Sequence, residues 1–498
     1  MIASVLNVLE PQDVDKIHAA SLELLWETGV RTGARGRDIL LSHGGRDRPG
    51  GLTGLPPELV EKALAGNRPF SLRSASRGEP LELLAGRRHV HNFGSAPLIV
   101  DAPGVQPRPS TLEDLIRSFR VLERLDVCDA VYPLVTPTDA PASLARVVSA
   151  AAAFLNSGKP AGIPVLDGRE TDAAIRLLEA AQGGPESVRR EPGAMIVLSP
   201  ISPLTFNDDC VEAMQASAGR GVPLLSLPCP ILGLTAPMSM AGGLTTQNME
   251  TLAFLTLLRL IDAQAKVVYG ARLGFANMRS GLHMDGRPEK GLLGAAAVQL
   301  ARKYGLPSDV YGMATAGHDA NDVQTGYDKA FGALQAMLAQ ADFASGLGCL
   351  SHARVTSLEL LAIDAEMYRM TKKITAGVQV DEESLAKEVI GQVMAGGGDF
   401  LGCRHTLKYV RSGEIHQSSL DRQLTHEKWL EAGRPGVGDA ARAEVDRLLS
   451  LEDEIPDNQA VVETWREIAA EMGHKDYRPQ LKLGPAASLR PGSRDAAR

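Results

Sequence analysis

The chain has 498 residues, 44% hydrophobic and 22% charged, the composition of a globular protein with roughly two to three domains or one large barrel with extensions. Its 52 basic and 60 acidic residues give a net charge of −8, which argues against nucleic-acid binding as the main function. The sequence contains no apolar run of about 18 residues and no basic start, so we expect neither a membrane span nor a signal peptide. Five scattered cysteines are too few for a disulfide scaffold, and their odd number predicts a cytoplasmic protein.

Residues 1–95 predict an extension of mixed helices and strands. Apolar residues recur at helical spacing over 13–27, and Gly29 can take the left-handed position that ends this helix. Pro57 follows Leu55-Pro56 and would begin a second helix, because proline is favoured in the first helical turn. Between 68 and 95, alternating residues and several glycines predict short strands and a hairpin.

Residues 96–375 repeat one unit, in which a short apolar run is followed by a turn and an amphipathic helix. Eight such units are typical of a (β/α)8 TIM barrel, an α/β fold. A doubly wound sheet is less favoured, because the chain has neither a GxGxxG turn after the first strand nor a Walker motif. The expected strands are 97–101, 130–135, 161–166, 194–199, 223–228, 266–271, 309–314 and 342–348. The expected helices are 111–124, 143–156, 170–182, 208–219, 244–262, 288–304, 324–340 and 356–371.

The remaining residues predict a C-terminal helical extension over 376–480 and a disordered tail over 481–498. The expected helices of the extension are 381–394, 420–432, 438–450 and 457–472. The helices within 420–472 are long enough to pack against a second subunit, so a homo-oligomer is one interpretation of this extension.

In a barrel of this kind, the candidates for substrate binding lie at the carboxyl ends of the strands and in the loops that follow. We therefore select six residues. Tyr269 and Arg272 end the sixth apolar run, His318 and Asp319 follow the seventh, His352 follows the eighth, and Glu250 lies in the helix after the fifth.

Structural roles compete with each of these assignments. Glu250 would be a solvated carboxylate, or a carboxylate stabilised by the dipole of its helix. Tyr269 would be a core residue of its apolar run. His318 and Asp319 would form a simple turn beside Gly317. In the same way, His352 would be a loop histidine with its hydrogen bonds satisfied, and Arg272 would pair with a neighbouring acid.

A metal site is not predicted. The nearest approaches to zinc-ligand spacing are Cys349-x2-His352 and Cys403-x-His405, which match no standard pair and lie more than fifty residues apart. A serine hydrolase is also disfavoured, because the Gly-x-Ser-x-Gly motif is absent.

Several segments, in the same order along the chain, resemble the trimethylamine methyltransferase family. They are GLTAPMSMAGGLTTQNMETLAFLTLLRL (233–260), AKVVYGARLGFANMRSGLHMDGRPEKGLLGAAAVQLARKYGLP (265–307), HDANDVQTGYDKAF (318–331), SLELLAIDAEMYR (357–369) and FLGCRHTLKYVRSGEIHQSSLDR (400–422). The N-terminal LELLWETGV and LPPELVEKAL also fit, so the resemblance runs from about residue 12 to about residue 450.

This resemblance implies a TIM barrel that moves a methyl group from a methylated amine to the cobalt of a separate corrinoid protein, with no tightly bound cofactor of its own. The archaeal trimethylamine enzymes carry pyrrolysine, whereas this chain has only the twenty standard residues. The loop from Ala316 to Asp319 is the expected equivalent position. Members without pyrrolysine include enzymes for quaternary amines such as glycine betaine, so a quaternary amine is the predicted substrate.

The chemistry of a quaternary ammonium assigns roles to the candidate residues. Its nitrogen is already cationic and donates no hydrogen bond, so aromatic faces and carboxylates must recognise it. Tyr269, Phe93 and Tyr132 would supply faces, and Glu250 and Asp319 would supply negative charge. Arg272, His318 or His352 would orient an anionic tail.

The corrinoid protein would dock over the carboxyl ends of the strands. Methionines in the loops there (Met238, Met240, Met278, Met284 and Met313) would suit a flat macrocycle, although each one alone is as well explained as a core residue.

Two other functions stay open at this point. A barrel lyase or decarboxylase would require a convergent basic cluster or a metal–carboxylate site, and a non-catalytic protein would bind a methylated amine without transferring its methyl group. The sequence does not select among glycine betaine, proline betaine and carnitine.

Overall fold

The barrel in this computed structural model is an α/β fold whose seven strands run parallel in one sheet. The structure describes residues 5–483, except 77, 85–86, 421–422 and 453. In spatial order the strands are β6 (His89–Asn92), β18 (Phe343–Leu347), β17 (Ser308–Tyr311), β14 (Val267–Ala271), β12 (Leu224–Ser226), β10 (Ala194–Leu198) and β9 (Ala161–Pro164). Bridges from Ala130 to His91 and from Val131 to Ala161 join the two outer strands. The ring therefore closes through residues 130 and 131, which confirms the predicted (β/α)8 barrel.

The prediction of the first barrel strand at 97–101 was wrong. The strand that occupies this place is β6, which pairs with β18 in the register His91 to Ser345. The sequence assigned this segment to the short strands of the N-terminal extension, because the buried and hydrogen-bonded side chains of His89, His91 and Asn92 interrupt the apolar run expected of a barrel strand.

The segment predicted as the first strand instead contributes to a small sheet. It contains β7 (Leu98–Ile99), which pairs with β8 (Arg108–Pro109) and β19 (Val355–Thr356). The second predicted run, 130–135, forms only isolated bridges, and Pro133 removes one of its backbone donors.

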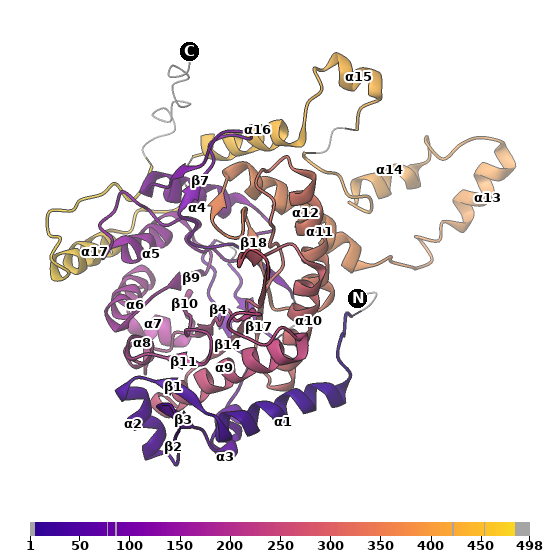
Figure 1. Cartoon of the computed structure of the whole chain (residues 1–498). Helices are drawn as coiled ribbons and strands as arrows, with labels where there is room; N and C mark the ends of the chain where they lie inside the picture. The colour runs from indigo at the N-terminus through magenta and orange to yellow at the C-terminus, as the bar shows by residue number, and fades with distance from the viewer. Residues whose placement is uncertain (1–4, 77, 85–86, 421–422, 453, 484–498) are drawn as a thin grey trace.

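Eight helices follow the strand positions and confirm the predicted alternation (Figure 1). Several of them begin with a capping side chain, for example the reciprocal capping box of Thr111 and Asp114 and the side chains of Asn207 and Ser357. Their bounds are α4 (Leu112–Arg124), α5 (Ala145–Asn156), α6 (Gly168–Gln182), α8 (Asp208–Ser217), α9 (Met240–Ile261), α10 (Pro288–Lys303), α11 (Val323–Leu338) and α12 (Leu358–Ala376). A short extra helix, α7 (Pro185–Arg190), was not predicted.

The N-terminal extension combines both predicted helices with small sheets. The helices are α1 (Pro11–Glu27) and α3 (Pro57–Leu64), and Gly29 has a φ of 83°, as expected for the left-handed residue after α1. The predicted hairpin is β4 (Ser71–Leu72) with β5 (Leu81–Glu82). The sequence did not reveal α2 (Ala34–Ser42), or the sheet that joins β11 (Thr205–Phe206) to β1 (Val30–Thr32), β3 (Leu52–Gly54) and β2 (Arg46–Arg48).

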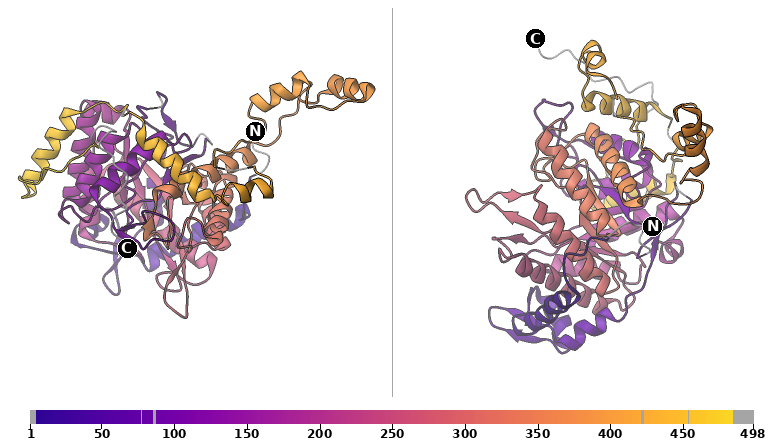
Figure 2. Two further views of the ribbon diagram at one scale, coloured as in Figure 1. Left: turned by 90° about the horizontal axis from the view of Figure 1, so that it is seen from above. Right: turned by 90° about the vertical axis from the view of Figure 1, so that its right-hand side faces the viewer.

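The C-terminal extension has a projecting part and a packed part. Helices α13 (Lys387–Gly396), α14 (Arg404–Arg411) and α15 (His426–Glu431) stand away from the barrel and contain no buried residue (Figures 1 and 2). By contrast, α16 (Val437–Ser450) packs on α12 and α4, and α17 (Gln459–Glu471) packs on α6 and α5. The four predicted helices are present, and α14 is additional. Of the tail predicted over 481–498, Leu481 is buried and accepts a hydrogen bond from Asn156, and residues 484–498 lie outside the described residues. The division of the chain into domains stays a prediction.

Within the described residues, no helix has both the length and the apolar character needed to cross a bilayer.

Glu250 ties α9 to the loop that follows β10. Its side chain is fully buried, and its two carboxylate oxygens accept hydrogen bonds from the Leu204 amide at 2.8 Å and from Ser202 Oγ at 3.0 Å. Burial raises the pKa of Glu250 to about 7, although both hydrogen bonds act in the opposite direction. Glu250 is therefore not a solvated carboxylate.

Glu250→Gln should stabilise the fold at pH 8 and change its stability much less at pH 5. The folded-state pKa of about 7 lies above the ordinary value of 4.5, so the stabilisation by the neutral acid is complete below pH 4.5 and is lost as the pH rises through 7. Glutamine can form hydrogen bonds with both Ser202 and the Leu204 amide, and it does not ionise. The substitution should therefore add about 1 to 3 kcal/mol to the free energy of unfolding at pH 8. Unfolding at both pH values measures this, with Glu23→Gln on the exposed face of α1 as control. An equal gain at both pH values would contradict the explanation by burial.

Candidate functional site

A cavity of 480 Å³ opens at the carboxyl ends of the barrel strands, and we call it the mouth cavity. Several lining residues lie at or just after strand ends: Phe93 follows β6, Cys229 lies three residues after β12, Arg272 follows β14, and Tyr311 ends β17. The hairpin of β15 (Gly274–Ala276) and β16 (His283–Met284) contributes His283 to the lining. The cavity is thus in the position where TIM barrels carry their active sites.

A buried ion pair forms part of the lining of this cavity. Arg272 Nη2 donates to Asp309 Oδ1 at 2.7 Å, and His91 Nε2 lies 3.1 Å from Asp309 Oδ2. The Arg272 guanidinium also donates to the Asp309 carbonyl at 3.1 Å. Burial alone would raise the pKa of Asp309, but Arg272 and His91 hold it below its ordinary value. Asp309 therefore stays ionised, and it fixes the Arg272 guanidinium in one orientation.

A second network surrounds Asp285, just after β16. Lys290 on α10 forms an ion pair with its carboxylate, and His283 Nε2 lies 3.1 Å from Oδ1. His352 Nδ1 accepts a hydrogen bond from the Asp285 amide at 3.2 Å. Although burial opposes it, Lys290 and His283 hold the pKa of Asp285 well below its ordinary range, whereas burial lowers the pKa of His352. This network joins the hairpin to α10 and to the loop after β18.

Aromatic rings face the space between the two networks. The Tyr311 ring lies 5.5 Å from the Arg272 guanidinium and 4.8 Å from Lys290 Nζ, and it stacks on Phe93 at 6.4 Å. Tyr132 stacks on His91 at 4.1 Å. The mouth cavity therefore combines π faces with charged groups that are already paired.

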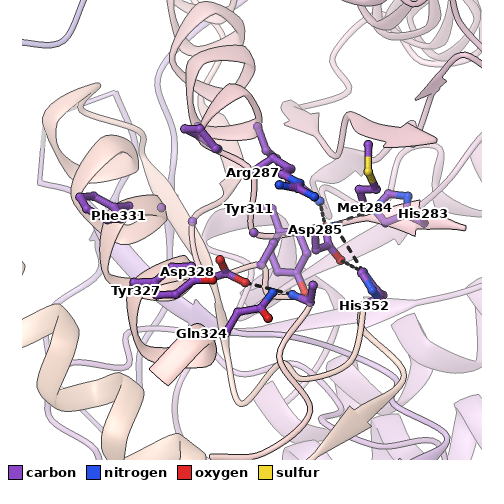
Figure 3. A pocket seen from close by; sticks show the side chains of 18 of the residues that line it. His283, Met284, Asp285, Arg287, Tyr311, Gln324, Tyr327, Asp328, Phe331 and His352 are labelled. Atoms are coloured by element: carbon purple, nitrogen blue, oxygen red, sulfur yellow. Dashed lines mark hydrogen bonds and ion pairs between the residues drawn. The ribbon is translucent and has the colours of Figure 1, made fainter. Parts of the chain in front are cut away.

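A second cavity of 530 Å³, which we call the side cavity, lies beside the first, between α10 and α11 (Figure 3). The two cavities share five lining residues, which form the wall between them: His283, Asp285, Lys290, Tyr311 and His352. On the opposite side, Tyr327, Asp328 and Phe331 project from α11.

The structure brings together two of the predicted site residues, since Arg272 and His352 both line the mouth cavity. Tyr269 does not line the mouth cavity. Its ring is fully buried, and its hydroxyl donates to Asn248 Oδ1 on α9 at 3.1 Å. Glu250 is likewise engaged with the loop after β10. Neither residue lines either cavity, because both pack between the barrel and α9.

His318 and Asp319 lie in the loop after β17 and line neither cavity. His318 Nδ1 is hydrogen-bonded to Ser351 Oγ, and Asp319 Oδ2 accepts from the Gly104 amide at 2.7 Å. Both residues therefore connect loops around the mouth. Phe93 and Tyr132, named as sources of aromatic faces, do line the mouth cavity.

Sequence reasoning missed most of the charged residues of the site. The strand-end rule was sufficient to select Tyr311, but the seventh run was expected to continue to residue 314. His91 and Asp309 lie within strands, and Asp285 and Lys290 lie beyond a hairpin that the sequence did not predict. Among the described residues, no three His, Cys, Asp or Glu side chains come together as a metal site.

The five methionines expected at the mouth differ in exposure, and Met284 is half-buried in the lining of the side cavity. Met238, Met240 and Met278 are 46%, 43% and 68% exposed, and the first and third converge on Gly233. Met313 is fully buried, so for this residue the core explanation is correct.

The sequence matches the family described as trimethylamine methyltransferase (MTTB) over residues 2–471. A Desulfitobacterium hafniense protein named trimethylamine methyltransferase MttB is 29% identical over 464 residues, which cover 92% of each chain. The Methanosarcina barkeri protein of that name is 27% identical over 475 residues, 92% of this chain and 95% of the relative. A further Desulfitobacterium hafniense protein, named glycine betaine methyltransferase, is 26% identical over 431 residues, 85% of this chain and 88% of the relative.

A solved structure described as the hydroxylamine MtmB complex has the same fold. The TM-score is 0.50 at 13% identity, with 89% of this chain and 88% of that chain covered. Since the family match extends over almost the whole chain, the protein is a methyltransferase and belongs to the trimethylamine methyltransferase family.

Proposed function

We propose that this enzyme transfers a methyl group from a carboxylate-bearing quaternary amine of the glycine betaine type to the cobalt(I) of a corrinoid on a separate protein. The observation that carries the proposal is the lining of the mouth cavity, which combines aromatic faces with two cations. A relative named glycine betaine methyltransferase and the absence of pyrrolysine from the chain favour this substrate over trimethylamine.

The aromatic lining supports recognition of the quaternary ammonium end. This group carries a full charge and offers no N–H, so it gains more from ring faces than from hydrogen-bond acceptors. Phe93 and Tyr132 both line the cavity, and the Phe93 ring stacks on Tyr311. We therefore orient the methylated nitrogen toward these two rings.

The cations support recognition of the carboxylate end. Arg272 and Lys290 flank the Tyr311 ring, and each already has a carboxylate partner. A zwitterion adds no net charge to this balanced set, so its binding leaves no buried charge without a counterion. A carboxylate near Lys290 and His352 would direct the opposite end of the molecule toward Phe93.

The chain supplies position and the exclusion of water. The N–CH₃ bond breaks with its electron pair remaining on nitrogen, so the leaving group is a neutral tertiary amine and no proton has to move. A cobalt(I) corrinoid, when present, supplies the nucleophile that accepts the methyl group. Phe93, Tyr132 and Arg272 would hold the bond along one line of attack and keep water from the site.

An apolar rim next to the mouth cavity fits a docked macrocycle. It consists of exposed side chains from the 231–240 loop and the β15–β16 hairpin: Leu234, Met238, Met240, Met278 and Leu282. Methionine adapts its shape to a flat partner, and an apolar patch of this kind is typical of an interaction surface. We expect the enzyme to work in the cytoplasm, where its free cysteines stay reduced.

Purified enzyme, mixed with a reduced corrinoid protein and glycine betaine, should produce dimethylglycine and a methylated corrinoid. The absorbance change of the cobalt centre and mass spectrometry of the amine measure the two products. Proline betaine and carnitine are tested beside it, and trimethylamine serves as the tertiary control. Methylation by trimethylamine alone would contradict the assignment to quaternary amines, and methylation by none of them would remove the proposed function.

Phe93→Leu should weaken glycine betaine binding roughly 2- to 30-fold, because leucine keeps most of the apolar volume but removes the ring face. Phe93→Tyr retains that face and should bind nearly as well as the unchanged enzyme. Isothermal titration calorimetry without any corrinoid protein measures both. Equal affinity of the leucine and tyrosine variants would exclude Phe93 from recognition of the ammonium group.

A further inference from the structure

The outer wall of the side cavity carries two aromatic rings that the barrel does not bury. Tyr327 and Phe331 lie one turn apart on α11 and are 50% and 65% exposed, yet both line the cavity (Figure 3). Residues four apart lie on one helix face, so the two rings project from the same side. Exposed aromatic side chains in a chain with 4% aromatic residues call for an explanation beyond packing.

A buried carboxylate lies next to these rings. Asp328 Oδ2 accepts from Thr315 Oγ1 at 2.9 Å and from the Ala316 amide at 3.2 Å, and the side chain is 7% exposed. Gly286 packs directly on it with a φ of 71°, and a Cβ at this position would lie 2.1 Å from Oδ2. The Asp328 carboxylate is thus held in a fixed position, with Gly286, just after the β15–β16 hairpin, packed against it.

A cation without a hydrogen-bonding partner completes the lining. Arg287 at the start of α10 is exposed, and in the described part of the chain its guanidinium forms no hydrogen bond or ion pair. It acts on Asp328 only through a longer-range attraction that lowers the pKa of this carboxyl, against the larger effect of burial. Its donors remain available to a carboxylate, which guanidinium groups bind well.

The side cavity is also next to the mouth cavity. Tyr311 and Lys290 belong to both linings, and the Tyr311 hydroxyl donates to Cys349 Sγ at 2.6 Å. The Tyr311 side chain therefore forms part of the wall that separates the two spaces.

We propose that the side cavity is a second binding site for the same class of zwitterionic quaternary ammonium compound, from which the compound passes Tyr311 into the mouth cavity. The ammonium end lies between Tyr327 and Phe331 beside Asp328, and the carboxylate end meets Arg287. This inference rests on the proposed function for the identity of the ligand, but its test requires no methyl transfer.

The test is calorimetry with glycine betaine and the full-length enzyme alone. The unchanged enzyme binds two molecules per chain, and the double variant Tyr327→Ala/Phe331→Ala weakens one of these sites about tenfold while the other is unaffected. The control is Val323→Ala, since Val323 is 80% exposed on the same helix and lines neither cavity. The control binds as the unchanged enzyme does. Circular dichroism checks that all three proteins are equally helical.

A single site in the unchanged enzyme overturns the inference, and so does an identical isotherm for the double variant. Failure of the proposed function is separate, because it appears as an absence of methyl transfer whatever the number of binding sites. Phe93→Leu gives the reciprocal result, since it weakens the mouth site and leaves the site at Tyr327 and Phe331 intact. Loss of both sites in the double variant would also contradict the inference, because the mouth cavity contains neither ring.

Discussion

The pairing of buried charges at the barrel mouth is the constraint on which the site depends. Asp309 and Asp285 are almost completely buried, and an unpaired carboxylate there would destabilise the fold by several kcal/mol. Arg272 and Lys290 neutralise them and, in doing so, fix β14, β17, the hairpin and α10 relative to one another. The aromatic rings of the mouth cavity are held in place by the same groups, so stability and ligand recognition use one set of contacts.

The alternation of strands and helices was predictable because it depends on apolar periodicity, which a TIM barrel repeats in every unit. Predictions failed where polar residues entered the barrel interior. Residues 89–92 were assigned to the short strands of the N-terminal extension, and the apolar run after them was predicted as the first barrel strand, although it belongs to the small sheet of β7, β8 and β19. A second failure is α2, which has just two buried residues and thus little apolar periodicity.

The candidate site was only partly predictable for a related reason. The strand-end rule predicts how far along the barrel axis a residue lies, but not whether its side chain points into the barrel or outward to the helices. Arg272 therefore lines the cavity as predicted, whereas the side chain of Tyr269, three residues earlier, points outward to α9. The partners of Arg272 lie far away in the sequence, and no local pattern joins residues 91, 272 and 309.

The projecting helices α13, α14 and α15 have a consequence for the evolution of the chain. The polypeptide leaves the barrel at the end of α12, contacts it again at His416 and Leu420, and packs on α12 once more through α16. The residues in between are thus topologically an insertion in a surface loop, and its length hardly affects the closure of the barrel. The length of this appendage can therefore change during evolution without altering the geometry of the barrel mouth.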